Sequence, residues 1–290
     1  MKWLSRAALG ALATVASSAA AGQDTDDPLL RPIAPDHAAR WLEPRPPTRI
    51  HGNSWLVGFG GLNVALIRTD AGLILIDGAV PQAVPAIEAN IRQLGFRIED
   101  VALILSTEPH YDHAGGIAAL ARDSGATVVA SAAAAEVLRR GRSGPDDPQA
   151  AHLPDFPAVE RLRIVADGET LRLGDTEVTA RATPGHTAGS MSWSWRPCDP
   201  EGCVDIVFAS SLNPVSADGY RFSDPRNRPV VAAFRRTFEA MRALPCDIII
   251  PAHPWIAPPG GDDQACRAYA DAHERRLDAR LAEEQAGSNP

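Results

Sequence analysis

Lysine is almost absent from this sequence: of 290 residues, only Lys2 is a lysine. Arginine therefore supplies nearly all of the positive charge, and the 36 acidic residues outnumber the 28 basic ones. Such an acidic chain is not expected to bind nucleic acid or an anionic membrane. An anionic group of a small-molecule ligand must be held by arginine, hydroxyls, amides, backbone N–H groups or a metal ion.

Two further absences narrow the class of protein. No G-x-S-x-G motif occurs, which argues against a serine hydrolase with a nucleophile elbow. Once the N-terminus is set aside, no stretch is long and apolar enough to span a bilayer, and no internal repeat stands out. The chain is long enough for one large domain or two small ones.

The N-terminus has the pattern of an export signal. Lys2 and Arg6 precede the apolar stretch 7–15 and the small-residue run 19–21. An ordinary N-terminal helix is the alternative, but the three-part pattern favours a signal peptide over 1–21 and a periplasmic product. Its removal leaves 26 basic and 36 acidic residues (28 − 2 = 26), a charge of −10. We expect an extended arm over 22–48 and a single domain over 49–290.

Cysteine is scarce, and its four copies suggest disulfides. In an exported chain, an even count and short spacings favour the pairs Cys198–Cys203 and Cys246–Cys266. A four-cysteine zinc site is the alternative.

From Ser54 onward, apolar strand-like runs alternate with amphipathic helical segments. We expect strands within SWLVGF, NVALIRT, LILIDGA, VALILST, TVVAS, SMSWSW, VDIVFAS and DIIIPAH, and a series of hairpins over 162–186. We expect helices within PQAVPAIEANIRQLGF, GGIAALARDSGA, AAAAEVLRRG, VAAFRRTFEAMRAL and the terminal segment 266–285. Strands followed by helices, twice over, predict an αββα sandwich, with two sheets face to face and helices outside.

The segment STEPHYDHAGGI, residues 106–117, carries the strongest chemical signal. His110, Asp112 and His113 stand in a loop that leaves an apolar strand, so their side chains can turn into one cavity. Two more histidines, His186 and His253, also follow predicted strands. Taken singly, each would more often be a packed histidine or a helix cap. Their joint occurrence at strand ends predicts a metal site.

These motifs resemble the metallo-β-lactamase superfamily from about Ser54 to the terminal helix. Beyond DHAGG, the segments LIDGAVPQ, ASSLNPVSADGY, ALPCDIIIPAHP and CRAYAD look like those of subclass B3 of the class B β-lactamases. Both cysteine pairings match bridges known in that subclass. The resemblance implies an enzyme that hydrolyses the β-lactam amide of penicillins, cephalosporins and carbapenems by means of a metal-bound hydroxide. We expect the protein to be a monomer.

The resemblance also implies two Zn²⁺ sites. The first would consist of Glu108, His110 and His186, and the second of Asp112, His113 and His253. Asp112 would also orient the hydroxide. Asp77 resembles a buried aspartate that steadies the metal loop, with a simple turn residue as the alternative.

Other positions are expected to contact the substrate. Ser211 and Asn213 resemble residues that bind the β-lactam carboxylate, and Gln149 looks like a glutamine that lines the cleft in some relatives. Tyr111 and Phe59 are candidates for its walls, whereas His152 is expected to be a solvated surface residue.

Two alternative functions remain open. The first is a metal-dependent lactonase that hydrolyses homoserine lactones. Relatives of that kind usually carry a bridging aspartate after the strand that ends here in IVFA, where this chain has Ser210 and Ser211. The second is a metal-binding protein without catalysis, which only Glu108 favours.

Glu108 departs from the resemblance, because most subclass B3 enzymes have histidine there. Zinc accepts carboxylate oxygen at about 2.0–2.2 Å, close to its distance from imidazole nitrogen. We therefore expect zinc to bind with altered affinity. The additional anion should also make the bound water less acidic than three histidines would.

Overall fold

The computed structural model describes residues 26–254 and 264–287. The expected signal segment 1–21, and the first residues of the expected arm, lie outside the described residues. Among the helices that are described, none is long and apolar enough to cross a membrane.

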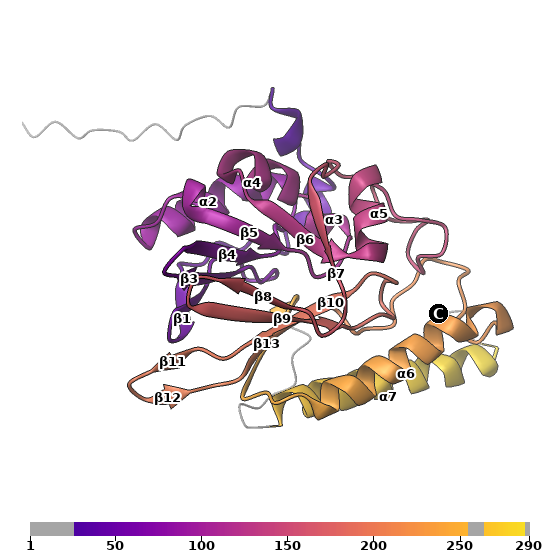
Figure 1. Ribbon diagram of the computed structural model, residues 1–290. Coiled ribbons are helices and arrows are strands. Elements are labelled where there is room, and N and C mark those ends of the chain that lie inside the picture. The colour runs from indigo at the N-terminus through magenta and orange to yellow at the C-terminus, as the bar shows by residue number, and fades with distance from the viewer. Residues whose placement is uncertain (1–25, 255–263, 288–290) are drawn as a thin grey trace, which may run out of the picture.

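Two β-sheets lie face to face at the centre of the fold, between outer layers of helices (Figure 1). The first sheet has the strand order β1-β2-β3-β4-β5-β6-β7, formed by Thr48–His51, Ser54–Leu56, Ala65–Thr69, Gly72–Ile76, Val101–Leu105, Thr127–Ser131 and Leu162–Val165. The second has the order β14-β13-β10-β9-β8, formed by Ile248–Pro251, Ile206–Ala209, Met191–Trp195, Thr176–Ala182 and Thr170–Leu173. This arrangement confirms the predicted αββα sandwich.

The helices form the two outer layers. The first sheet is covered by α2 (Val84–Gln93), α4 (Ile117–Ser124) and α5 (Ala132–Arg140), and the second by α6 (Arg228–Ala243) and α7 (Ala265–Gln285) (Figure 1). Short helices are η1 (Pro28–Leu30), α1 (Pro35–Ala38), η2 (Pro81–Ala83), η3 (Ile98–Asp100), α3 (Tyr111–Ala114) and η4 (Pro225–Asn227). Local capping follows sequence rules: Ser131 Oγ accepts a hydrogen bond from the Ala134 amide at 3.1 Å, which starts α5.

Strand β4 shows why its sequence is apolar throughout. Leu73 and Leu75 face the helices of the first layer, whereas Ile74 and Ile76 enter the core between the two sheets. Because successive strand residues point to opposite faces, a strand buried on both sides has no polar alternation. A third apolar core lies under α6 and α7. Each buried side chain of this size stabilises the fold by about 1.5–3 kcal/mol relative to exposure.

The strand directions bring several loops to one edge of the sandwich. In the first sheet β4, β5 and β6 run parallel, so Asp77 and the segment after Leu105 leave the sheet at the same edge. In the second sheet β14 runs parallel to β13, and β9 has the same direction because both β9 and β13 are antiparallel to β10. The segments after β9, β13 and β14 therefore also share an edge.

One expected element was wrong. Residues 162–186 do not form a hairpin series, because β7 joins the first sheet parallel to β6, and only β8 and β9 form a hairpin. The turn residues between β7 and β8 carry the chain from one sheet to the other. A turn of the same composition serves a hairpin or a crossing between sheets, so sequence alone does not separate the two.

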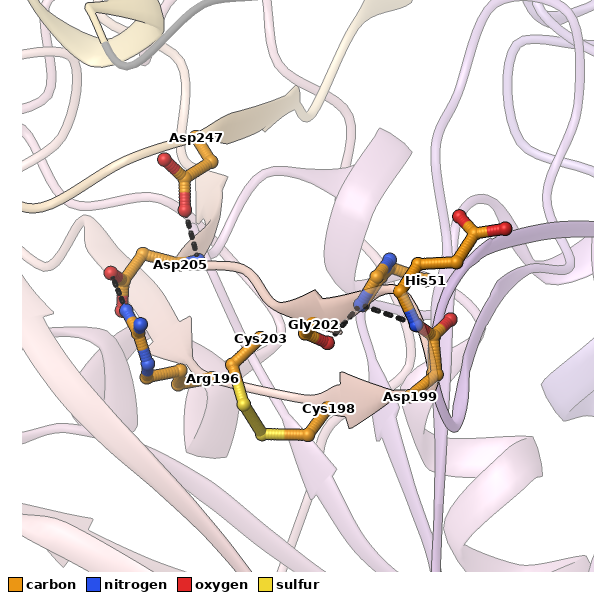
Figure 2. Close-up of a disulfide and its surroundings, with 10 residues drawn as sticks. His51, Arg196, Cys198, Asp199, Gly202, Cys203, Asp205 and Asp247 are labelled. Carbon is orange, nitrogen blue, oxygen red and sulfur yellow. Dashed lines mark hydrogen bonds and ion pairs between the residues drawn. A yellow bond between two sulfur atoms is a disulfide. The ribbon is translucent and has the colours of Figure 1, made fainter.

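Both expected disulfides are present and link Cys198 to Cys203 and Cys246 to Cys266. The first closes the hairpin of β11 (Cys198–Asp199) and β12 (Gly202–Cys203), shown in Figure 2. His51 of β1 fastens this hairpin to the first sheet, since its Nε2 lies 3.0 Å from the Gly202 carbonyl oxygen. The disulfide thus stabilises a projecting hairpin away from the strand ends described above.

Candidate metal centre and active site

The segment after β5 folds back sharply and buries its polar side chains. It enters the single-turn helix α3 at His110, and the amides of His113 and Ala114 donate to the His110 carbonyl oxygen at 3.0 and 2.8 Å. This turn directs Glu108, His110, Asp112 and His113 into the interior, where all four are buried.

Six side chains from three segments of the chain meet there in two adjoining groups. Glu108, His110 and His186 form the first group, and Asp112, His113 and His253 the second; within each, the candidate ligand atoms lie within 4.8 Å of one another. The groups are in contact, because Glu108 Oε1 lies 2.9 Å from His113 Nε2. The structure therefore brings together all six residues that the resemblance assigned as ligands.

Each of the four imidazoles has one nitrogen facing a protein oxygen outside the two groups; three of these contacts are hydrogen bonds, and the contact of His113 is longer. These contacts are His110 Nε2 to Asp147 Oδ2 at 2.8 Å, His186 Nδ1 to the Asn213 carbonyl oxygen at 2.8 Å, His253 Nδ1 to the Gly61 carbonyl oxygen at 3.0 Å, and His113 Nδ1 to Asp77 Oδ2 at 3.4 Å. Such contacts fix the tautomer and orientation of a metal-binding histidine.

Asp77 links the end of β4 to the histidine loop. Its carboxylate accepts hydrogen bonds from the Thr107 amide at 2.8 Å and the Thr107 hydroxyl at 2.6 Å. The backbone of Asp77 has φ +68°, a conformation uncommon outside glycine. Burial raises the pKa of Asp77 above its ordinary value, against the opposing effects of His113 and Thr107. These contacts go beyond those of a simple turn residue.

Glu108 is held through both carboxylate oxygens. Its Oε2 accepts a hydrogen bond from the Ser211 amide at 2.9 Å, while Oε1 faces His113 and lies 3.8 Å from His186 Nε2. Burial raises the pKa of this carboxyl, but the imidazoles of His113 and His186 outweigh burial and hold the pKa well below its usual range. Glu108 therefore presents an ionised oxygen to the centre.

The donor set fits divalent cations. The Nε2 atoms of His113 and His253 are 3.1 Å apart, while each Nδ1 faces an oxygen acceptor. When both Nε2 atoms are unprotonated, as metal ligation requires, their lone pairs point toward the same small volume, an arrangement that a nearby cation stabilises. Imidazole nitrogen with carboxylate oxygen is a ligand set typical of zinc and other first-row metals. The two groups can thus hold a pair of metal ions.

Glycines permit the close approaches around this centre. Gly185 has φ +147°, and a Cβ there would lie 2.6 Å from the Phe234 ring. A Cβ on Gly116 would lie 2.2 Å from the Gly78 carbonyl oxygen. The glycine before His186 and the last glycine of DHAGG are therefore required by packing.

A cavity of about 560 Å³ opens onto the two groups. Ser211, Asn213 and Gln149 all line it. Ser211 Oγ and Asn213 Oδ1 are buried and have no hydrogen-bond partner within the described part of the chain, and Gln149 Nε2 lies 3.2 Å from His186 Nε2. These side chains are positioned to meet a ligand in the cavity.

Of the two residues expected to form walls of the cleft, one lines the cavity and the other does not. Tyr111 lines the cavity as expected, and the exposed His152 stands at its rim. Phe59 does not line it but packs in the core of the first layer, where it pairs with Pro44 of the arm. An apolar residue beside a glycine-rich turn gave no sign of which face it would join.

Sequence reasoning missed Asp147, Gly61 and Trp41. Asp147 stands two residues before Gln149, and its position in a polar loop was the only available signal. Gly61 acts through its carbonyl oxygen, which has no sequence signature. Trp41 is buried against the second group, with its ring centroid 5.7 Å from that of His253.

Three solved structures with similar folds are all described as metallo-beta-lactamases. One, described as the first B3 metallo-beta-lactamase with an active-site glutamic acid, is 59% identical, with 90% of this chain and 99% of that chain covered and a TM-score of 0.88. The Rm3 metallo-beta-lactamase is 44% identical, with 86% and 98% covered and a TM-score of 0.83. MIM-1 from Novosphingobium pentaromativorans is 40% identical, with 85% and 93% covered and a TM-score of 0.81.

Curated relatives are more distant. A hydroxyacylglutathione hydrolase of Acidiphilium cryptum (strain JF-5) is 30% identical over 57% of this chain and 53% of its own length. The chain thus spans about half the length of the curated relatives it matches. The family model of the metallo-beta-lactamase superfamily matches residues 57–253, the span that contains both ligand groups. With more than half of its length matched, the chain belongs to the metallo-beta-lactamase superfamily.

Proposed function

We propose that this protein is a subclass B3 metallo-β-lactamase that hydrolyses the β-lactam amide of penicillins, cephalosporins and carbapenems. One observation carries the proposal: two adjoining groups of metal-ligand side chains open onto a cavity that is also lined by Ser211 and Asn213, whose buried Oγ and Oδ1 atoms have no hydrogen-bond partner among the described residues. The 59% identical relative with an active-site glutamic acid supports it, because Glu108 belongs to the first of these groups.

In this proposal, Glu108, His110 and His186 hold one zinc ion, and Asp112, His113 and His253 the other. Bound zinc would supply polarisation of the substrate carbonyl and a lowered pKa of water. Asp112 is suited to orient the attacking water. Burial raises its pKa, but His113 and His253 outweigh burial and hold the pKa below its ordinary value, so an ionised oxygen is available to accept a hydrogen bond.

Substrate contacts are proposed for three polar residues that line the cavity. The Ser211 hydroxyl and the Asn213 side-chain N–H would donate hydrogen bonds to the carboxylate of the β-lactam ring system, since both residues line the cavity and Ser211 Oγ has no partner among the described residues. Gln149 would contact the substrate beside His186. Asp77 would position His113, and Asp147 would position His110.

Three further parts of the proposal concern the whole protein. Residues 1–21 would direct export to the periplasm, residues 22–48 would form an arm, and the catalytic domain would comprise 49–290. We also propose that the protein acts as a monomer. The two disulfides are consistent with export, because such bridges persist in oxidising compartments.

The lactonase alternative is less well supported. Ser210 occupies the position where a bridging aspartate is expected, and its hydroxyl lies 2.8 Å from Thr183 Oγ1. The strand end therefore offers a neutral hydroxyl that is already hydrogen-bonded.

A spectrophotometric assay tests the proposal. The purified protein with zinc should hydrolyse a carbapenem, should lose activity with a chelator and should regain it when zinc is restored. His186→Ala, prepared in parallel, should be inactive. Hydrolysis of a homoserine lactone without turnover of any β-lactam would replace the proposal by the alternative, and inactivity on both would indicate a non-catalytic protein.

A further inference from the structure

The segment before β1 forms one wall of the cavity and is tied to the second ligand group. The Gly61 amide donates to the Trp41 carbonyl oxygen at 3.0 Å, and the Gly61 carbonyl oxygen in turn faces His253 Nδ1. The Trp41 ring also lies 6.0 Å from the Tyr111 ring. Residues near Trp41 therefore have a fixed position beside His253.

Arg40 precedes Trp41 in the sequence and lines the cavity. Its Cζ lies 4.8 Å from the centroid of the Trp41 ring, within the range of a cation–π contact. Its Nη2 lies 2.5 Å from His37 Nε2, and His37 also lines the cavity. The aromatic face and the imidazole hold the guanidinium at the rim, where it remains exposed.

No carboxylate of the described residues neutralises the charge of Arg40. Among the described residues, Arg40 forms no ion pair with a carboxylate, and it is the one arginine that lines this cavity. The lining carboxylates, Glu108 and Asp112, belong to the ligand groups.

Arg40 adjoins a different ligand group from the one that the proposed carboxylate contacts adjoin. Ser211 and Asn213 adjoin the first group through Glu108 and His186. Arg40, by contrast, adjoins the second group through Trp41, which packs on His253. A ligand that spans both groups therefore meets the hydrogen-bond donors of Ser211 and Asn213 beside one group and an arginine beside the other.

Resting on the proposed function, we propose that Arg40 is a specificity residue that binds an anionic group on the acyl side chain of the substrate. The enzyme then favours β-lactams that carry a second carboxylate over neutral counterparts. Arginine suits this role because its planar guanidinium matches carboxylate geometry. The contact acts mainly through binding, so its effect falls on KM more than on kcat.

Two penicillins provide a matched test: carbenicillin is benzylpenicillin with one additional carboxylate on its acyl side chain. The ratio of kcat/KM for carbenicillin to that for benzylpenicillin is measured for the zinc-loaded parent, Arg40→Gln and Arg40→Lys. We expect Arg40→Gln to lower this ratio by roughly fivefold, the scale of a partly exposed charge pair. Arg40→Lys should restore most of it, and added salt should lower the parent ratio toward that of Arg40→Gln.

Arg45→Gln is the control, because Arg45 is an exposed arginine of the same segment that pairs with Glu43 and does not line the cavity. It removes the same charge and should leave the ratio unchanged. An unchanged ratio in Arg40→Gln, with both penicillins hydrolysed, overturns the inference alone. An equal loss on both penicillins also overturns it, because Arg40 would then serve the ring carboxylate. Hydrolysis of neither penicillin by the parent overturns the proposed function and this inference together.

Discussion

The main-chain amide of Ser211 donates a hydrogen bond to Glu108 Oε2 at 2.9 Å, which connects the acidic member of the first ligand group to the end of β13. The other oxygen, Oε1, is left to face the imidazoles. A carboxylate with two acceptor oxygens can serve the backbone and a cation at the same time. This relationship gives Glu108 a fixed orientation.

Replacement of Glu108 tests its electrostatic effect. Glu108→His removes one negative charge from the centre, so the acidic limb of the pH–rate profile should move to lower pH by roughly one unit. Glu108→Gln keeps the size but removes the charge, and its metal content after dialysis should fall. Superimposable profiles and equal metal contents for all three proteins would show that the charge of Glu108 does not influence the centre.

Asp147→Asn tests the positioning of His110. The carboxylate lies 2.8 Å from His110 Nε2, and its loss should weaken metal binding at the first group by about 10- to 100-fold. Competition with a chromophoric chelator measures this affinity. Asp146→Asn is the matched control, since Asp146 is the exposed neighbour in the same loop. Equal affinities in the two variants would remove the positioning role.

Glu284 of α7 fastens that helix to a loop near the cavity. It is buried, and it accepts hydrogen bonds from the amides of Phe222 and Ser223 at 3.1 and 2.7 Å and from Arg280 Nε at 2.7 Å. Glu284→Gln should lower the free energy of unfolding at pH 7 by about 2 kcal/mol. The exposed Glu283→Gln serves as the control and should change it little.

The same contact predicts a pH dependence. Burial raises the pKa of Glu284, but the Ser223 and Arg280 hydrogen bonds outweigh burial and lower it. A lowered pKa in the folded state contributes stability that is present above the unfolded pKa of about 4.3 and is lost as pH falls through the folded value. The difference between parent and Glu284→Gln should therefore shrink in acid. A difference independent of pH in urea titrations would contradict this assignment.

The two disulfides should differ in their contribution to stability. Cys246–Cys266 spans a sequence separation of 20 and Cys198–Cys203 a separation of 5. In the chain-entropy model, removing the first by double serine substitution should cost about 3 kcal/mol and removing the second about 2 kcal/mol. Chemical denaturation of both variants measures these losses. A larger loss for the short loop would show that native contacts, and not loop closure, dominate.

Much of the fold followed from the sequence because its signals are local. The runs in β4 and β5 are apolar on both faces, which is characteristic of central strands between helices and a second sheet. The Ser131 cap of α5 and the proline at the start of the η2–α2 segment are likewise signals within a few residues of the elements they begin. The placement of β7 did not follow, because the choice of partner sheet is decided by tertiary packing.

The site was predictable where side chains carry the chemistry. Histidines and carboxylates after strands pointed to the two groups that the structure assembles. The supporting contacts were less accessible: the Gly61 carbonyl oxygen acts through the main chain, and Trp41 approaches His253 from a segment 212 positions earlier (253 − 41 = 212). Such contacts depend on how distant loops meet.

The oxygen atoms that face the four imidazoles also bear on whether folding or metal binding comes first. Because an oxygen of the polypeptide faces one nitrogen of each ring, a cation that binds after folding meets ligands that are already oriented. The scaffold need not be built around the ion. The metal-free protein should therefore lose its activity while it remains folded, and should regain that activity when the ion is added again.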